Sequence, residues 1–473
     1  MSESSDLTRR TVLTAAVLAP AAVGLAASAE VAAAAEPGGE RAADPDLGPN
    51  VSVFDPSMPA ADIQARLDEV FAQQETNPFG GNRFALLFKP GDYNVDANIG
   101  FYTQILGLGL SPDEVTVTGA VHAEADWFDG NATHNFWRGA ENLAVVPVSG
   151  TDRWAVSQAA PYRRMHLRGD LELDDGGWSS GGLIADCKID GRIRSGTQQQ
   201  WLSRNAEIGG WDGSNWNMVF VGVDNPPSGD FPEPPYTRVD TSPIVREKPF
   251  LYIDEAGAWR VFVPSPHVDA TGTSWSAGAP EGESLPLEQF LIVTAGHTAA
   301  DINAALSQGK DLLVTPGVYH LDDTVRVTRP GTVVLGLGLA TFIPDNGVTA
   351  MTVEDVGGVA IAGLLFDAGT TNSQTLMEVG PRGASATHPD NPTSLHDLYF
   401  RVGGADVGKA TQSLVINSHN VIGDHLWIWR GDHGDGIGWD TNTAATGLVV
   451  NGDDVTMYGL FVEHYQEFQT VWN

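Results

Sequence analysis

A carboxylate and an imidazole lie side by side near the end of the sequence and are the first candidates for chemistry. Glu463 and His464 directly follow the apolar run of residues 460–462. A carboxyl group that is positioned against a substrate can give or take a proton during hydrolysis. We expect Glu463 to lie at the end of a strand, either in such a role or as a solvated carboxylate in a turn.

A second polar cluster occupies residues 432–436, with the sequence DHGDG. A metal ion is one reading of this cluster, but its spacing lacks the alternating acidic positions of a calcium loop. We therefore predict a polar turn that lines a cleft, and we expect neither a metal nor any other cofactor.

Four tryptophans sit among Gly, Asn and Ser residues rather than in apolar runs: Trp137, Trp178, Trp201 and Trp439. A sugar ring stacks on an aromatic face that is placed on a polar surface, although Trp is also a common core residue. We predict sugar contacts for Trp137 and Trp178, and favour the core for Trp201 and Trp439.

Three consecutive glutamines at residues 198–200 have two interpretations. Their side chains could stack as an amide ladder, which we expect, or one of them could reach a sugar hydroxyl, for which Gln200 is the candidate. Two neighbouring arginines, Arg163 and Arg164, are expected to pair with nearby carboxylates rather than to contact a substrate.

Composition narrows the class of protein. The 473 residues carry a formal net charge of −34. A surface this acidic repels phosphate backbones and anionic lipid, which argues against nucleic-acid and membrane partners, whereas neutral glycans remain compatible. The acidity could equally serve only solubility. The single cysteine, Cys187, lies in an apolar run and is predicted to be a small core residue of a monomer.

The N-terminus resembles an export signal. Arg9 and Arg10 precede an Ala/Val/Leu run, and small residues at 27–29 offer a cleavage site. These features predict a twin-arginine signal peptide over residues 1–35, in preference to a membrane anchor, followed by a disordered leader over residues 36–50. We therefore expect a secreted, extracellular protein.

One string of elements occurs twice in the chain. The sequences ADI, PG and LGLGL begin at residues 61, 90 and 106, and again at residues 300, 316 and 335, at offsets of 239, 226 and 229 residues. ADI opens a short amphipathic helix in each copy. We interpret the two copies as homologous modules.

Within a module, short β-rich runs alternate with Gly, Asn and Asp turns. Residues 359–366, 421–428 and 455–462 share one pattern, which begins with Val and ends with Leu and two further apolar residues. Such runs predict stacked coils of a parallel β-helix, with the opening helix capping the first coil. A pair of β-sandwiches is the alternative.

Composition also suggests the boundaries. Residues 51–225 form the first predicted module and residues 291–473 the second. Between them, residues 226–290 are Pro- and Gly-rich and contain one strong hairpin signal at 250–263, so we predict a linker with a β-hairpin.

Several motifs resemble glycoside hydrolase family 55. They are YRRMHLRG at residues 162–169, GWSSGG at 177–182, GTQQQWLSRN at 196–205, HNFWR at 134–138 and GLFVEHYQ at 459–466. The resemblance spans about residues 50–473. It implies an all-β protein of two tandem, right-handed, pectate-lyase-like parallel β-helices that cleaves β-1,3-glucan from a chain end with inversion.

The resemblance also assigns site residues. Ser180 matches the family's water-holding serine, Gln158 matches its glutamine partner, and Glu463 matches a glutamate of the second module that joins this network. On the residues alone, Ser180 and Gln158 would be polar turn residues. His134 and Trp137 of the HNFWR motif are further candidates for substrate binding. The expected partner is a neutral β-glucan polysaccharide or oligosaccharide.

The family's general acid lies shortly downstream of the point where this sequence ends, at Asn473. No residue here inherits that role, so we expect an incomplete fragment of a longer enzyme, or a truncated relative, with impaired activity. A glycan-binding protein without catalysis and a β-helix polysaccharide lyase remain as alternatives.

Overall fold

A computed structural model describes residues 44–473 of the chain. The predicted signal peptide, residues 1–35, and residues 36–43 of the predicted leader lie outside the described residues. The prediction of disorder is wrong for residues 44–50, because Asp44 pairs with Lys89 at 2.8 Å and Leu47 is buried in a core cluster. No helix between residues 44 and 473 has the length and apolar character needed to cross a bilayer.

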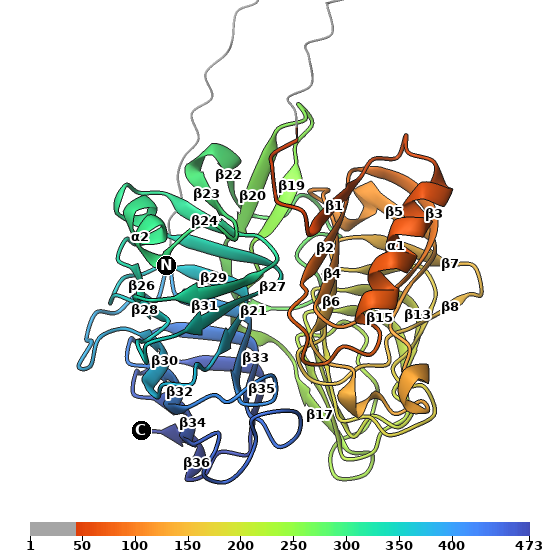
Figure 1. Ribbon diagram of the computed structural model, residues 1–473. Helices are drawn as coiled ribbons and strands as arrows, with labels where there is room; N and C mark the ends of the chain where they lie inside the picture. The colour runs from red at the N-terminus through yellow and green to blue at the C-terminus, as the bar shows by residue number, and fades with distance from the viewer. Residues whose placement is uncertain (1–43) are drawn as a thin grey trace, which may run out of the picture. The chain divides into compact units, whose positions relative to one another are not determined.

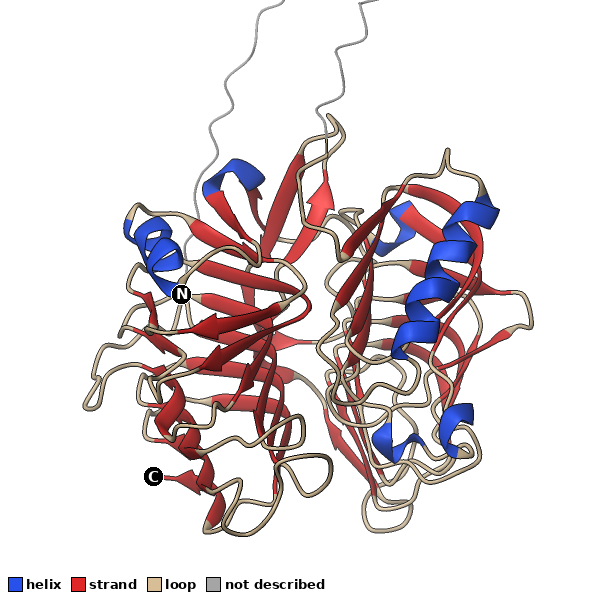
Figure 2. Cartoon of the chain, viewed as in Figure 1, coloured by secondary structure: helices blue, strands red, loops and turns tan. Residues whose placement is uncertain are grey.

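The first module consists of two parallel sheets wound from one coiled chain (Figures 1 and 2). One sheet has the order β1 (Val51–Phe54), β2 (Phe84–Phe88), β4 (Thr103–Gly107), β6 (Arg138–Glu141), β9 (Pro161–Arg163), β12 (Leu183–Ala185), β14 (Gln200–Arg204), β16 (Asn217–Val221) and β17 (Tyr236–Val239). The other has the order β3 (Gly91–Asn98), β5 (Val115–His122), β7 (Ala144–Pro147), β10 (His166–Leu167), β13 (Lys188–Arg194), β11 (Asp170–Glu172) and β8 (Thr151–Arg153), with β15 (Glu207–Asp212) on β13.

The second module repeats this plan. Its larger sheet has the order β23 (Phe290–Val293), β24 (Asp311–Val314), β27 (Val333–Pro344), β29 (Ala360–Asp367), β31 (Thr393–Val402), β33 (Val421–Arg430) and β35 (Thr456–Glu463), with β25 (Val318–Leu321) on β27. Its smaller sheet has the order β26 (Val325–Val327), β28 (Met351–Val353), β30 (Ser373–Val379), β32 (Ala410–Ile416), β34 (Ala444–Val450) and β36 (Phe468–Trp472).

The three segments with a shared sequence pattern are stacked strands. They form β29, β33 and β35, and all of their pairings are parallel. Strand β31, which the pattern did not reveal, lies between β29 and β33. The parallel β-helix predicted from these segments is therefore confirmed.

A helix closes the core at the N-terminal end of each module. Helix α1 (Ala60–Gln74) buries Ile63, Leu67 and Val70, which are spaced to lie on one helical face. Helix α2 (Ala299–Ser307) begins with a capping box, in which Thr298 and Asp301 bond each other's backbone N–H groups. Short 3₁₀ turns span Pro112–Glu114, Asp126–Phe128, Ala132–His134 and Leu287–Gln289.

The segment between the modules pairs its strands in the antiparallel sense. Strands β19 (Phe250–Ile253), β20 (Trp259–Pro264) and β22 (Gly282–Pro286) form one sheet, and β18 (Ser242–Arg246) pairs with β21 (Pro266–Ala270). The hairpin signal at 250–263 thus marks β19 and β20.

The predicted end of the first module at residue 225 needs correction. Strand β17 (Tyr236–Val239) pairs in parallel with β16, so the first module continues into the predicted linker. The Pro-rich residues 226–235 are a long turn between two coils. Composition alone does not distinguish such a turn from a linker between domains.

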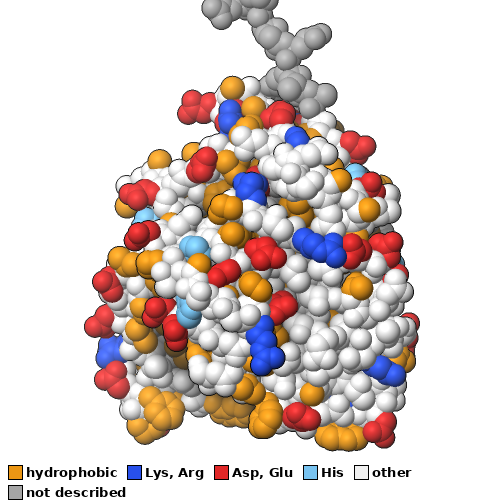
Figure 3. All heavy atoms as spheres, turned by 90° about the vertical axis from the view of Figure 1, so that its left-hand side faces the viewer, with side chains coloured by type: hydrophobic (Ala, Val, Ile, Leu, Met, Phe, Trp, Pro, Cys, Tyr) orange, Lys and Arg blue, Asp and Glu red, His pale blue; other side chains and the backbone are white. Residues whose placement is uncertain are grey.

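Each module has its own apolar core, and aromatic and aliphatic side chains also pack between the modules. One such cluster joins Phe101, Tyr102, Phe136 and Trp137 of the first module to Tyr399, Trp427 and Trp429 of the second. Figure 3 shows that acidic side chains are scattered over one face of the molecule rather than gathered in a patch.

A buried ionic network also ties the modules together. Arg163 of β9 donates to Asp397 and Asp424 of the second module, at 2.8 Å each. Arg204 of β14 bonds Asp424 at 2.9 Å and also pairs with Glu247. Burial alone would raise the pKa of Asp424, but Arg204 and Arg163 lower it. Arg163 is therefore an ion-pair partner, as the sequence predicted.

We predict that Arg163→Met lowers the free energy of unfolding by about 3–5 kcal/mol, because two buried carboxylates lose their shared cation. Urea denaturation would measure this loss. The matched control is Arg192→Met, which breaks an exposed pair with Asp212 and should cost less than about 1 kcal/mol. Equal losses in the two variants would contradict the role given to the network.

Candidate active site

The last strand of the larger second-module sheet, β35, presents alternate residues to its own core and to the first module. Leu460 and Val462 pack against the core of the second module. Phe461 belongs to the aromatic cluster between the modules. Because successive side chains of a strand point to opposite faces, Glu463 lies on the same face as Phe461 and is directed toward the first module.

Both oxygens of the Glu463 carboxylate accept hydrogen bonds from N–H donors. Gln158 of the first module donates from Nε2 to Oε1 at 3.1 Å. Trp427 of β33 donates from Nε1 to Oε2 at 2.8 Å. The carboxylate is therefore held from both modules, although it is only partly buried.

Gln158 connects Glu463 to two serine hydroxyls. Its Oε1 accepts a hydrogen bond from Ser180 Oγ at 3.2 Å and another from Ser157 Oγ. The two hydroxyls are 2.5 Å apart. The structure thus brings together the three residues that the sequence assigned to catalysis, Ser180, Gln158 and Glu463.

Two turns of the first module position Ser180 and Gln158. Gln158 precedes β9, next to Ala159, whose φ of 56° turns the chain into that strand. Ser180 precedes Gly181, whose φ of 126° favours glycine. The Gly181 N–H is bonded to Oε1 of buried Gln198 at 2.8 Å, so the Ser180 turn is anchored to the next coil.

The backbone is also strained beside Glu463. His464 directly follows β35 and has a φ of 67°. This left-handed conformation is costly for a residue with a Cβ atom. Its imidazole Nε2 lies 3.5 Å from Asp432, which also contacts His433 at 2.8 Å. The predicted polar turn at residues 432–436 therefore lies beside the candidate site.

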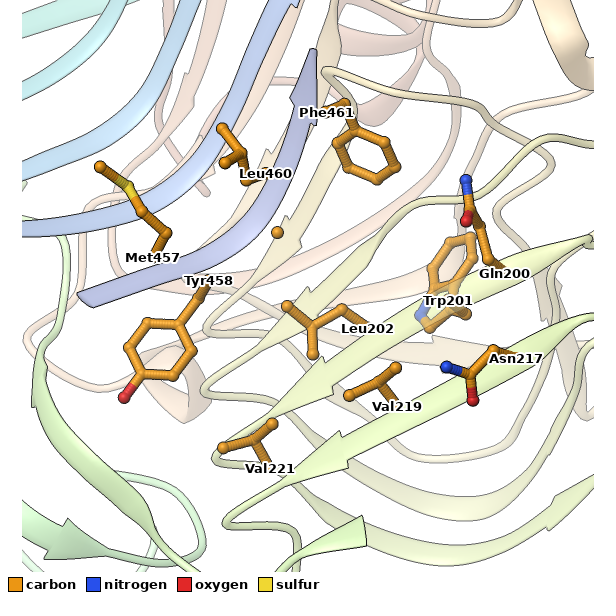
Figure 4. A pocket seen from close by; sticks show the side chains of 11 residues that line it. Gln200, Trp201, Leu202, Asn217, Val219, Val221, Met457, Tyr458, Leu460 and Phe461 are labelled. Atoms are coloured by element: carbon orange, nitrogen blue, oxygen red, sulfur yellow. The ribbon is translucent and has the colours of Figure 1, made fainter. Parts of the chain in front are cut away.

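A pocket of about 280 Å³ opens between β14 and β16 on one side and β35 on the other (Figure 4). Phe461, which lines it, lies two residues before Glu463. The wall of the pocket is mainly apolar, with the amides of Gln200 and Asn217 as polar groups. Figure 4 shows Phe461 and Gln200 on facing sides of this pocket. The full lining is Gln200, Trp201, Leu202, Asn217, Val219, Val221, Met457, Tyr458, Gly459, Leu460 and Phe461.

Two histidines meet between the modules. The rings of His134 and His433 stack with centroids 4.7 Å apart. Burial and the neighbouring His433 lower the pKa of His134. His134 is half-buried and also stacks on Phe128.

The prediction that Trp137 contacts a sugar is wrong. Its side chain is 1 % exposed and packs among Tyr102, Phe136 and Trp427. The polar residues that surround it in the sequence suggested a surface position, but the second module covers it. Trp178, by contrast, is 70 % exposed and remains a candidate.

The amide ladder predicted for residues 198–200 is not formed. Gln198 is buried, and its Nε2 donates to the carbonyl oxygens of Val156 and Leu173. Gln200, the candidate for substrate binding, donates to the carbonyl oxygen of Ser180 at 3.2 Å and so lies against the Ser180 turn. Trp201 is buried, as favoured from the sequence, whereas Trp439 is exposed.

Sequence reasoning missed two residues of the site. Trp427 lies in an apolar run that resembles an ordinary buried strand, and Ser157 has no distinguishing context. The only signal that could have found Trp427 is its indole N–H, a hydrogen-bonding group beside the apolar residues Leu426 and Ile428.

Residues 44–473 contain no group of three or more His, Cys, Asp or Glu side chains arranged to hold a metal ion. Cys187 is buried in the first module, and burial raises the pKa of its thiol to about 12. A thiol in this environment is a core residue rather than a nucleophile.

The fold and the site define a tandem parallel β-helix protein with a polar cluster between its modules, and comparisons with known proteins narrow the class. Residues 290–473 match the model of the LAM55 pectate lyase-like domain. An exo-beta-1,3-glucanase from Streptomyces sp. (strain SirexAA-E / ActE) is 59% identical over 431 residues, which cover 90% of this chain and 71% of that protein.

Two solved structures agree with this match. The structure of sacteLam55A from Streptomyces sp. SirexAA-E has a TM-score of 0.89 and 59% identity, covering 90% of this chain and 78% of that one. A glutamate-to-alanine variant of sacteLam55A in complex with glucose has the same TM-score and identity, covering 91% and 78%. The chain belongs to glycoside hydrolase family 55.

The contact between the Gln158 amide and the Glu463 carboxylate can be tested by substitution. In Gln158→Glu, a second carboxylate replaces the donor 3.1 Å from Glu463. Since two adjacent carboxylates cannot both ionise without repulsion, the variant should be less stable than the parent by about 1–3 kcal/mol at pH 8 and by less at pH 4.5. Urea denaturation at the two pH values measures the difference.

The exchange Gln158→Glu with Glu463→Gln is the matched control. It restores one amide and one carboxylate in reversed positions, so most of the lost stability at pH 8 should return. A double variant as unstable as Gln158→Glu alone would show that the two side chains are not in contact.

Proposed function

We propose that this chain is a β-1,3-glucan hydrolase that acts from a chain end with inversion at the anomeric carbon. The observation that carries the proposal is the Glu463 carboxylate, held between the modules and linked through Gln158 to Ser180. The 59% identity to an exo-beta-1,3-glucanase supports the substrate class.

In this proposal, Glu463 and Ser180 hold the attacking water. The carboxylate takes a proton from the water as its oxygen bonds to the anomeric carbon, and the bond from that carbon to the leaving sugar oxygen breaks. Gln158 bonds both the Ser180 hydroxyl and the Glu463 carboxylate, and so fixes their positions relative to each other. The leaving oxygen must also gain a proton. Inverting enzymes take it from a carboxylic acid, a role that we assign to no residue of this sequence, so in this chain the proton comes from bulk water and the step is slow.

The surroundings of Glu463 suit a neutral sugar. The adjoining pocket combines an apolar wall with the amides of Gln200 and Asn217, which offer both donors and acceptors. Exposed Trp178 lies two residues before Ser180 and supplies an aromatic face for a ring. Figure 4 shows this pocket between β14 and β16 on one side and β35 on the other.

The first test is hydrolysis of laminarin by the wild-type chain and by Glu463→Gln. We expect slow glucose release, since the activity of this chain is predicted to be impaired, with the α-anomer formed first. The variant should show a further loss of about 100-fold in kcat, because the amide cannot accept the proton of water. Reducing-sugar assays give the rate and proton NMR gives the anomer.

Glu467→Gln is the matched control, because Glu467 is an exposed carboxylate four residues further on, and it should retain activity. Unchanged activity in Glu463→Gln would remove Glu463 from the mechanism. Laminarin binding without hydrolysis by the wild-type chain would instead favour a glycan-binding protein.

We also propose that the protein is made with a twin-arginine signal peptide, residues 1–35, and a leader that ends before Asp44, and is secreted. The support is the pair Arg9 and Arg10 before an apolar run that ends in small residues.

Replacing Arg9 and Arg10 together by lysine should stop export and leave the protein in the cytoplasm of the producing cells. Immunoblots of culture medium and cell lysate would measure this redistribution. Continued appearance of the double variant in the medium would contradict the proposed export route.

A further inference from the structure

We propose that Trp427 is a positioning residue that sets the orientation of the Glu463 carboxylate. The inference rests on the catalytic role proposed above for Glu463. Its starting point is the hydrogen bond of 2.8 Å from Trp427 Nε1 to Glu463 Oε2.

The indole of Trp427 is held rigidly. It is 3 % exposed and is surrounded by the rings of Phe136, Trp137 and Trp429, with centroid distances of 5.2, 5.3 and 5.2 Å. A donor fixed by packing loses little freedom when it binds its acceptor, so it can define the position of a more mobile side chain.

Glu463, by contrast, lacks rigid support of its own. It is the last residue of β35, it is partly exposed, and a strained His464 follows it. Its register partner on β33 is Trp429, whereas Trp427 pairs with Phe461, so the indole reaches Glu463 diagonally along the outward face. This contact lies within the second module.

The second donor to the carboxylate comes from the other module. Gln158 bonds Oε1 while Trp427 bonds Oε2, and together they fix the plane of the carboxylate. An indole N–H is only a donor, and it binds an ionised carboxylate more strongly than a neutral acid. Trp427 therefore holds one oxygen of the carboxylate in place and leaves the remaining lone pairs for water.

Laminarin kinetics of Trp427→Phe test the proposal, because phenylalanine keeps an aromatic ring but removes the N–H donor. We expect kcat to fall about 10- to 100-fold, as for the loss of one hydrogen bond to a charged group, with KM changed less than threefold. The loss should therefore fall on kcat rather than on KM, because the carboxylate stays in the site but loses the donor that fixes its orientation.

Trp429→Phe is the matched control. Trp429 lies in the same cluster and stacks on Phe79 and Trp427, but makes no hydrogen bond to Glu463. Its kcat should stay close to that of the wild type. An unchanged kcat in Trp427→Phe, or equal losses of kcat in both variants, would overturn the proposal in favour of a purely structural role.

A second measurement does not depend on activity. In protein labelled with ¹⁵N-tryptophan, the indole N–H resonance that disappears in Trp427→Phe should shift in Glu463→Gln, because its acceptor changes from a carboxylate to an amide oxygen, and should stay in place in Glu467→Gln. An indole resonance indifferent to Glu463→Gln would overturn the inference. Absence of hydrolysis by the wild-type chain would instead count against the proposed function, while the resonance still decides on Trp427.

Discussion

The site depends on one constraint, the burial of charges that are balanced only when the two modules lie in one register. Arg163 follows Gln158 by five residues and binds Asp397 and Asp424 of the second module. Asp424 lies in β33, the strand that also carries Trp427 and pairs with the strand of Glu463. A shift of one coil would separate these charges at a large desolvation cost, so the network also sets the contact between Gln158 and Glu463.

Much of the fold was predictable, because each coil must bury a similar set of apolar residues at similar positions. That requirement made β29, β33 and β35 recognisable as copies of one pattern. It failed for β31 (Thr393–Val402), in which His396 and Asp397 interrupt the apolar sequence. Asp397 belongs to the buried contacts between the modules, and its partners Arg163 and Lys248 are more than a hundred residues away in the sequence.

The site was predictable only in part, because its contacts also join residues that are far apart in the sequence. Family motifs indicated Ser180, Gln158 and Glu463, which the structure brings together. Local composition was a poor guide to exposure, because it placed Trp137 on the surface, where the second module covers it. Trp427 was missed since its hydrogen-bonding group shows its importance only when Glu463 of the next coil lies beside it.

Helices α1 and α2 have a consequence for self-association. A coil whose apolar interior is open to solvent is a template on which a second molecule could stack and extend the spiral indefinitely. Ile63 and Leu67 of α1, and Ile302 and Leu306 of α2, fill the N-terminal mouths of the two spirals with side chains from an element that cannot be extended by a strand. A strand of a second molecule therefore meets no open apolar interior at these two mouths.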